Sequence, residues 1–559
     1  MAKAAVLITY REIFKKEPDL SELHKILKEY ERREVIFLLA KLNILLGTWQ
    51  NTPQFELDQR LSTYLLGGLQ NELRETRGSS LSRVVFSRLT LLYVMKQACI
   101  ACPEKGSQLN TRKAHSEMGV CCLMANDLLL PFIPSPSDGL LERLTNLLPF
   151  ADYVSHGNYP MEIGRTKLIF DEVSKLQPLA ARADFIDLLA SFQNHLGLDA
   201  SIFCELCFGC SSKFLNIKLE ELEANPELAV LRRNTFFSKS QVPNEQATHF
   251  FQKLTISEPD FVKKVNESKE RPANDLTIFQ AFPLVEIAND VFVCLDPGFL
   301  VDKAGRSLYW TLFFQIPEDQ RGKLASFWGA VFESYVNYVL EKSYSAGGKF
   351  LPDPRFPNGD ASFDACILEG RNLLVLEHKS SVIRADAKYS GDPAKLKKEL
   401  DLKFIEGEAD GAKGLTQISK HLYRFFNGEK LGDLSSADVD RVFPIMVCLE
   451  NTMVVPYVGR YLNEQFREML PRRGFRQVVT PVFILGAPDI ENLLGYLQSY
   501  ALSEILESYY SKNRSLTTSI STSEVPILKN KKPGQNIVME RFSNFSETAI
   551  QHLFGDDVP

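Results

Sequence analysis

Two acidic residues and a lysine between positions 364 and 379 have the types and spacing of a catalytic site. They flank two apolar runs, 365–368 and 373–376, and the break between these runs contains Gly370-Arg371, which predicts a β-hairpin. Counting outward from that turn gives these opposed pairs: Leu368 with Leu373, Cys366 with Val375, and Asp364 with Glu377. Opposed Cβ atoms lie roughly 4.5–5.5 Å apart, and Lys379 shares the strand face of Glu377. Two carboxylates and an ammonium are therefore expected at one point.

Phosphodiester hydrolysis is the chemistry that uses such a group. Two carboxylates this close repel each other unless a cation lies between them, and Mg²⁺ takes carboxylate, water and phosphate oxygens as ligands. The metal polarises the phosphoryl group and acidifies a water, which a nearby lysine can orient. Asp364 and Glu377 are therefore candidate ligands of Mg²⁺, for which Mn²⁺ should substitute, and Lys379 is a candidate catalytic residue. The alternative is a surface hairpin with a cross-strand salt bridge.

These residues resemble the motif of the PD-(D/E)XK nuclease superfamily, in which an Asp and a Glu-x-Lys lie on adjacent strands. The matching residues here are Asp364 and Glu377-His378-Lys379. The resemblance implies a restriction-endonuclease-like α/β sandwich with a mixed central sheet and the element order α-β-β-β-α-β. It covers only the C-terminal half of the chain.

The segments around the motif carry patterns that fit this order. Residues 324–340 have apolar side chains at helical spacing, and 349–351 forms a short candidate strand after Gly347-Gly348. Downstream, 413–426 is an amphipathic helix and 442–449 an apolar strand. A helix, three strands, a helix and a strand are therefore expected in succession.

The resemblance also implies that a glutamate of the first helix is a further metal ligand and that a glutamine of the second helix assists. Glu333 and Gln417 match these positions. Lys413, Lys420 and Arg424 lie on the same helix face as Gln417, where they are expected to contact the phosphate backbone. The alternatives are an exposed helix glutamate at 333 and a plain solvated face around 417.

Three positions depart from the pattern or compete with it. His378 stands where an apolar residue is usual, and its side chain should point to the opposite face as a structural histidine. Phe363 replaces the proline of the motif name. Asp360 has the same parity as Asp364 and is a rival for the first carboxylate, but only Asp364 stands opposite Glu377.

Composition describes an ordinary protein of several domains, without the charge of a general nucleic-acid binder. The 559 residues are 45% hydrophobic and 24% charged, with a net charge of −6 and a pI near 5.9. This balance leaves room for a local cationic groove or for an activating protein partner that loads the substrate. No targeting segment or membrane span is apparent, which indicates a cytoplasmic protein.

Ten cysteines raise the question of zinc, because Cys99-x-x-Cys102 and Cys204-x-x-Cys207-x-x-Cys210 have short spacings. Both sets lie in apolar helical segments, and three cysteines spaced by three along one helix cannot surround a tetrahedral ion. Buried hydrophobic cysteines are the preferred interpretation. A zinc-dependent sensor remains the alternative.

The rest of the chain predicts a multidomain α+β protein. A helical regulatory or recognition region spans 1–275, and a hairpin with an aromatic segment bridges 276–316. The nuclease domain spans 317–510 and includes a further expected strand, 476–485, and a helix from 490 to near 510. A linker with a tail spans 511–559, and the linker itself is expected at 511–524, which is rich in Ser, Thr and Asn. The helical stretches expected in the first region are 20–47, 58–77, 81–101, 116–130, 165–196 and 244–254. Packing is preferred over base stacking for the aromatic segment.

The combined interpretation is a Mg²⁺-dependent endonuclease that cuts DNA in preference to RNA and acts as a homo-oligomer. Proteins that join a helical region to such a domain resemble the nuclease effectors of bacterial anti-phage defence, an analogy at the level of fold. The alternative is a catalytically silent scaffold on a nuclease fold that binds nucleic acid or protein.

Overall fold

The chain divides into two compact units, and neither is a continuous segment. The computed structural model describes residues 6–47, 54–78, 83–129, 139–154, 159–215, 217–238, 240–272, 275–406, 414–450, 453, 455–470 and 477–555. Unit 1 comprises 1–133, 192–308 and 546–559, and unit 2 comprises 134–191 and 309–545. The structure therefore divides the chain differently from the predicted boundaries near 276, 317 and 511.

Unit 1 is mainly helical. Its helices are α1 (Tyr10–Phe14), α2 (Leu20–Leu27), α3 (Arg32–Gly47), α4 (Gln54–Leu65), α5 (Gln70–Arg77), α6 (Arg88–Ala101), α7 (Arg112–Leu129), α12 (Ala200–Leu215), α13 (Leu219–Ala224), α14 (Arg233–Phe236), α15 (Asn244–Leu254), α16 (Glu258–Glu267), α17 (Thr277–Ala281) and α18 (Pro297–Ala304). Short strands β1 (Val6–Leu7) and β2 (Arg83–Val84) pair in parallel. Three further helices cross from one unit into the other: α11 (Leu188–Leu196), α19 (Ser307–Gln315) and α27 (Ile537–Phe554).

The predicted bridging hairpin belongs to a small sheet of unit 1. Its strands β5 (Leu284–Ala288) and β6 (Val291–Cys294) are antiparallel, and β3 (Val230–Arg232) and β4 (Thr255–Ser257) complete the order β3-β6-β5-β4. All ten cysteines of the chain are free and buried. Burial raises the pKa of each affected thiol, as at Cys207, where the neighbouring Cys204 adds to the effect. The cysteines are therefore core residues, as predicted.

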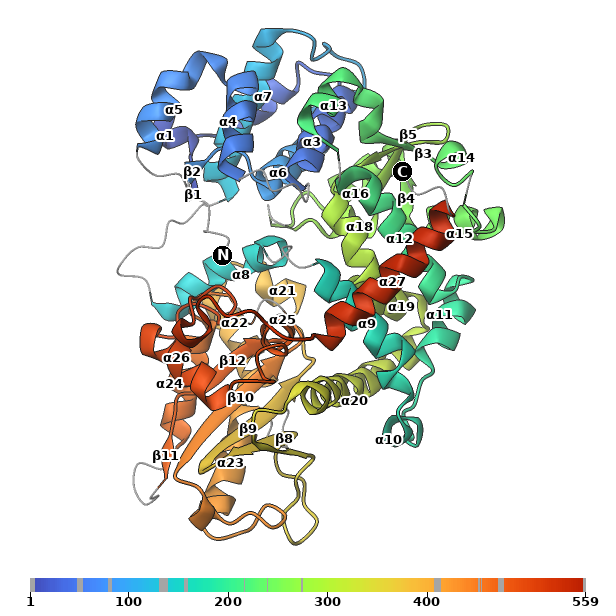
Figure 1. Cartoon of the computed structure of the whole chain (residues 1–559). Coiled ribbons are helices and arrows are strands. Elements are labelled where there is room, and N and C mark those ends of the chain that lie inside the picture. Colours follow the sequence, from blue (N-terminus) through green and yellow to red (C-terminus); the bar gives the residue numbers. More distant parts are fainter. Residues whose placement is uncertain are drawn as a thin grey trace. The chain divides into compact units, whose positions relative to one another are not determined.

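Unit 2 is built on a mixed six-stranded sheet. Its strands are β7 (Lys349–Pro352), β8 (Ala365–Glu369), β9 (Asn372–Lys379), β10 (Arg441–Cys448), β11 (Val478–Val479) and β12 (Phe483–Gly486). The pairings β7-β8 and β8-β9 are antiparallel, and β10 pairs in parallel with β9, β11 and β12. Figure 1 shows β8, β9 and β10 side by side in this unit. The predicted helix, three-stranded meander, helix and parallel strand occur in that order, but two further helices, Ala385–Lys388 and Pro393–Leu400, lie between the meander and the predicted second helix.

Helices cover both faces of this sheet. The helices of unit 2 are α8 (Leu140–Val154), α9 (Tyr159–Asp171), α10 (Gln177–Ala180), α20 (Glu318–Ser343), α21 (Ala385–Lys388), α22 (Pro393–Leu400), α23 (Leu415–Phe426), α24 (Val458–Met469), α25 (Ala487–Leu493) and α26 (Leu502–Lys512). On one face, Leu373 and Val375 of β9 share a buried core with α8, α22, α23 and α24. On the other face, α20 contacts β9, and Tyr509 of α26 contacts Phe483 of β12. Strand β9 is therefore packed between helices on both faces of the sheet.

Several predicted elements differ in their limits. The stretch 20–47 is two helices, α2 and α3, and 58–77 is divided between α4 and α5. The predicted strand 476–485 is interrupted, because Pro481 has no N–H for the ladder, and it becomes β11 and β12. A single helix predicted to run from 490 toward 510 is α25 and α26.

The predicted linker 511–524 is packed into unit 2. Asn513 is buried there, and its amide donates to the Tyr509 hydroxyl at 2.7 Å and to the Thr518 carbonyl at 2.9 Å. Its serines and threonines hydrogen-bond to one another and to the backbone, although Thr518 and Thr522 stay exposed. A polar composition that is typical of linkers is here the composition of an ordered turn.

Part of the aromatic segment also packs inside unit 2. The rings of Tyr309 and Trp328 stack with centroids 4.5 Å apart, and Trp328 also contacts Phe170 of α9. Phe314 remains 63% exposed. Packing, the preferred interpretation of this segment, is therefore confirmed for Tyr309.

Candidate active site

The hairpin that carries the motif has the predicted register. Leu368 pairs with Leu373 and Cys366 with Val375 across a turn at Gly370-Arg371, and Gly370 has φ of +60°. A left-handed first residue is what a type II′ hairpin turn requires, and glycine adopts it without steric cost. This register brings Asp364, directly before β8, to the end of β9 that carries Glu377 and Lys379.

Asp364 is tied to β9 through both its backbone and its side chain. Its N–H donates to the Leu376 carbonyl at 3.1 Å, and its carboxylate accepts from the His378 N–H at 2.6 Å. Burial raises the pKa of Asp364, against the effect of the His378 hydrogen bond and of the Lys379 charge. The carboxylate is thus held in one place at a cost in free energy when it is ionised.

Glu377 and Lys379 form a buried ion pair beside it. Lys379 Nζ lies 2.5 Å from Glu377 Oε1, and only 13% and 1% of the two side chains are exposed. Among the residues that the structure describes, Glu377 Oε2 has no hydrogen-bond partner. Burial and the nearby Asp364 carboxylate raise the pKa of Glu377 to about 8. Although burial opposes the charge of Lys379, Glu377 and Asp364 raise the pKa of that ammonium, which favours its charged form.

Two more carboxylates, Glu333 and Asp353, take part in the electrostatics of this group of side chains. Glu333 lies on α20, as predicted, and although its side chain reaches solvent, burial by the surrounding protein and the charge of Asp364 raise its pKa to about 7. Asp353 follows β7, has φ of +43°, and donates its N–H to the Asp364 carbonyl at 3.0 Å. Its charge raises the pKa values of both Asp364 and Glu333. The sequence interpretation missed Asp353, whose only local signal is an acidic residue at the end of the first strand.

These carboxylates do not form a preformed metal site with three or more protein ligands among the residues that the structure describes. In the described ranges, no group of three or more His, Cys, Asp or Glu side chains is arranged to hold a metal ion. Glu333 is therefore coupled to Asp364 by charge, while its role as a third ligand stays a prediction. Because Mg²⁺ commonly uses one or two carboxylates and completes its shell with waters and phosphate oxygens, Asp364 and Glu377 suffice as protein ligands.

Helix α23 brings Gln417 to the strand that leads into the site. The Gln417 amide donates to the Ser362 carbonyl at 3.4 Å, two residues before Asp364. On the same helix Lys420 and Tyr423 are exposed, while Lys413 lies outside the described residues. Gln417 thus supports the approach to Asp364, and Lys420 remains available to a ligand in solution.

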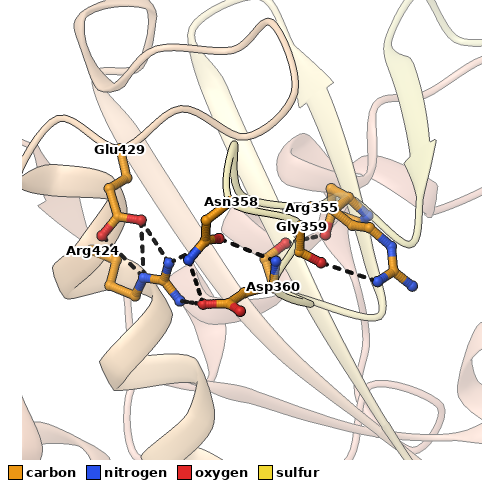
Figure 2. A network of polar contacts seen from close by, with 8 residues as sticks. Arg355, Asn358, Gly359, Asp360, Arg424 and Glu429 are labelled. Carbon is orange, nitrogen blue, oxygen red and sulfur yellow. Dashed lines mark hydrogen bonds and ion pairs between the residues drawn. The ribbon is translucent and has the colours of Figure 1, made fainter.

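Arg424 is engaged within the protein, as Figure 2 shows. Its guanidinium contacts Glu429 at 2.7 Å and Asp360 at 3.0 Å, and it lies 3.8 Å from the centroid of the Phe356 ring. These contacts fasten the β7–β8 connection to α23 and occupy the side chain that was expected to contact phosphate. The hydrogen bonds from Asn358 and Arg424 lower the pKa of Asp360, which is thereby committed to this clamp. Asp360 is therefore not the carboxylate opposite Glu377.

Histidines near the site are structural. His378 is buried, and within the described part of the chain neither ring nitrogen has a hydrogen-bond partner. Burial, together with the charge of Lys379, lowers the pKa of His378 to about 3, so the ring is neutral. His421 of α23 stands edge-on to Phe356 and Phe363, with ring centroids 5.6 Å away in each case. The expected structural role of His378 agrees with this burial.

Comparison with protein-family models, with curated proteins and with solved structures finds no match for this chain. None of the helices in the described segments is long and apolar enough to cross a membrane. Function must therefore be argued from the site itself.

Proposed function

We propose that unit 2 is a divalent-metal-dependent nuclease that hydrolyses phosphodiester bonds of DNA. The observation that carries the proposal is the group at the end of β9: Asp364 and Glu377 side by side, with the Lys379 ammonium on one Glu377 oxygen. The order of helices and strands around it also agrees with the PD-(D/E)XK resemblance. No step of the proposal depends on unit 1.

The donor set fits a hard divalent cation. Glu377 Oε2 is a buried oxygen without a hydrogen-bond partner among the described residues. Burial makes ionisation of both Asp364 and Glu377 costly, and the Asp364 charge adds to that cost at Glu377. A cation of charge +2 beside these oxygens would remove that cost. Asp364 and Glu377 would hold it, with Glu333 as a further candidate ligand.

In the proposed reaction, the residues of the chain position the attacking water and stabilise the charge that develops on the phosphate. Bound Mg²⁺ would supply Lewis-acid polarisation of the phosphate and a water of lowered pKa. Lys379, charged and fixed by Glu377, would orient the attacking water and stabilise the charge that develops on the phosphoryl oxygens. The hydrogen bond from the His378 backbone keeps Asp364 in place, and Gln417 steadies the segment that precedes it.

Cleavage of supercoiled plasmid tests the proposal. Wild-type protein with Mg²⁺ or Mn²⁺ should nick or linearise the plasmid, and EDTA should abolish the reaction. Lys379→Ala should lower the rate by about 10²-fold or more, as expected for loss of a group that acts on the transition state. Lys398→Ala, which removes an exposed lysine of α22, serves as the control for loss of a lysine charge as such.

A second candidate is a binding scaffold without catalysis. It is favoured by the Lys379–Glu377 ion pair, which neutralises the motif without a metal, and by the lack of a three-ligand group in the described ranges. Plasmid that stays intact at every metal tested, together with DNA binding that is unaffected by EDTA, would select this candidate. Cleavage that is equal in wild type and Lys379→Ala would show that the group at β9 is not the active site.

A further inference from the structure

A segment far from the motif in sequence is fastened to the helix that carries Glu333. This segment, residues 177–187, comprises α10 and the turn that follows it, and it belongs to unit 2. The Asp184 carboxylate accepts a hydrogen bond from the Ser326 hydroxyl of α20 at 2.7 Å. Beside it, the Phe185 ring stands edge-on to the buried Phe327 ring, with centroids 5.5 Å apart. One polar and one apolar contact therefore define where the segment lies on α20.

Arg182 projects from this segment with part of its guanidinium unused. Its Nε and Nη2 donate to the two Asp184 oxygens at 2.8 and 3.0 Å, which fixes the plane of the guanidinium. The side chain is 41% exposed and has no other polar partner among the described residues. Since a guanidinium carries five N–H donors, several remain for a ligand from solution.

The contacts of its segment with α20 place Arg182 near the helix face that carries Glu333. Ser326 and Glu333 are seven residues apart, which is two helical turns on one face and about 10 Å along the axis. The charges also interact, since Arg182 lowers the pKa of Glu333 against the effects of burial and Asp364, and Glu333 adds to the effect of Asp184 in raising the pKa of Arg182.

The site needs such a cation for its substrate. Asp364, Glu377 and Glu333 act electrostatically on the buried Lys379 ammonium, and Asp353 acts on Asp364 and Glu333. A nucleic-acid backbone that approaches these carboxylates is itself negative. Arginine binds phosphate oxygens bidentately and stays charged at any physiological pH.

We propose that Arg182 binds a backbone phosphate of the DNA substrate beside the scissile bond, and thereby aligns the strand along α20. The inference rests on the proposed nuclease function and assigns a substrate contact to a residue outside the predicted motif. Asp184 remains bound to Ser326 and keeps the guanidinium oriented while its outer N–H groups meet the phosphate.

The test measures DNA affinity and its salt dependence in the full-length chain. A short fluorescein-labelled DNA duplex is titrated with wild type, Arg182→Ala, Arg182→Lys and the control Arg460→Ala. Arg460 is likewise half exposed and paired with a carboxylate, Glu464 at 2.8 Å. Anisotropy in Ca²⁺ gives Kd at several salt concentrations, plasmid cleavage in Mg²⁺ gives KM and kcat, and thermal unfolding gives Tm.

Loss of one phosphate contact should weaken binding about tenfold and reduce the slope of log K against log salt by about 0.9. Arg182→Ala should raise KM and leave Tm unchanged, and Arg182→Lys should keep most of the salt slope because it keeps the charge. Arg460→Ala should match wild type.

Two results would overturn the inference while leaving the nuclease intact. One is cleavage by wild type with equal Kd and salt slope in Arg182→Ala and Arg460→Ala. The other is a fall in Tm and kcat without any change of slope, which would mean that Arg182 only holds the 177–187 segment. Wild-type protein that neither binds nor cuts DNA would overturn the proposed function together with this inference.

Discussion

Glu377 is buried next to a second carboxylate, so its ionisation depends on the cation that stands beside it. Lys379 satisfies one of its oxygens, and burial and Asp364 raise its pKa to about 8. For an acid whose folded pKa exceeds its unfolded value, stability is fully present below the unfolded pKa and is lost as pH rises through the folded pKa. Without metal, ionisation of Glu377 is therefore expected to lower the stability of the protein progressively as pH rises from about 5 to about 8.

Metal should reverse this dependence. Because carboxylates bind metal in their deprotonated form, Mg²⁺ competes with the proton on Glu377, and its affinity should fall about tenfold for each pH unit below 8. The increase in Tm caused by a fixed Mg²⁺ concentration should therefore be small near pH 6 and large near pH 8.5, measured by thermal unfolding.

Two variants control this prediction. Glu377→Gln should lose the Mg²⁺ effect at every pH, whereas Glu399→Gln, which removes a buried carboxylate paired with Arg384, should retain it. A Tm increase that is equal at both pH values would contradict a ligand with a raised pKa.

At the scale of single residues, the sequence predicts the motif residues but not the residues that interact with them in the fold. Asp364, Glu377 and Lys379 follow from counting along a hairpin, because strand geometry has a period of two. Asp353 reaches Asp364 from the end of β7. Arg182, which interacts with the charge of Glu333, belongs to a segment that precedes α20 by well over a hundred residues. No local periodicity connects such residues, and only the tertiary fold brings them together.

The β8–β9 hairpin is the element that sets the geometry of the site. Its turn places every residue of β8 opposite its partner on β9, and a shift by one residue would move Asp364 away from the face of Glu377. The Arg424 clamp shown in Figure 2 holds the incoming end of β8, and α23 holds its flank through Gln417. The register of the hairpin and the Arg424 contacts together place the carboxylates of Asp364 and Glu377 beside each other.

Gly370→Ala should weaken this element without touching any side chain. The position is open, with nothing within 4 Å of an added Cβ, so the cost is that of φ at +60°, about 1–2 kcal/mol. Gly322→Ala in α20, equally open but helical, should instead stabilise by about 0.4–1 kcal/mol. Urea unfolding followed by circular dichroism measures both. Equal effects of the two substitutions would mean that the turn is not under this constraint.

Element types in unit 2 were predictable, because the apolar periods of helix and strand differ. Where the predicted limits of an element differ from the structure, the cause can be identified. Pro481 divides a strand, and the polar stretch after Lys512 is ordered by its own side-chain hydrogen bonds. Composition alone does not distinguish such a turn from a linker.

Over the whole molecule, unit 2 is assembled from separated stretches of chain. A buried network shows this: Arg165 of α9 contacts Glu491 of α25 at 2.5 and 3.0 Å, and the Tyr335 hydroxyl of α20 donates to Glu491 at 2.7 Å. All three side chains are buried. Unit 2 thus depends on a segment that the predicted domain 317–510 does not contain.

Glu491→Leu should destabilise unit 2 by about 3–5 kcal/mol, because it leaves the Arg165 charge buried without its partner. The double variant Arg165→Met with Glu491→Leu should recover much of that loss, since no charge is then left unpaired. Urea titration of the full-length chain compares the variants. Additive losses in the double variant would mean that the two residues act independently.

The interleaved order of the two units also has a consequence for biosynthesis. Helices α8 to α10 leave the ribosome before the residues of unit 1 from 192 to 308 have been made, whereas α20 and the sheet follow afterwards. At about 5–20 residues per second, these helices wait on the order of ten seconds for their partners. Nascent chains therefore carry an unfinished apolar surface during that interval, because α20 and the strands that complete unit 2 have not yet been made.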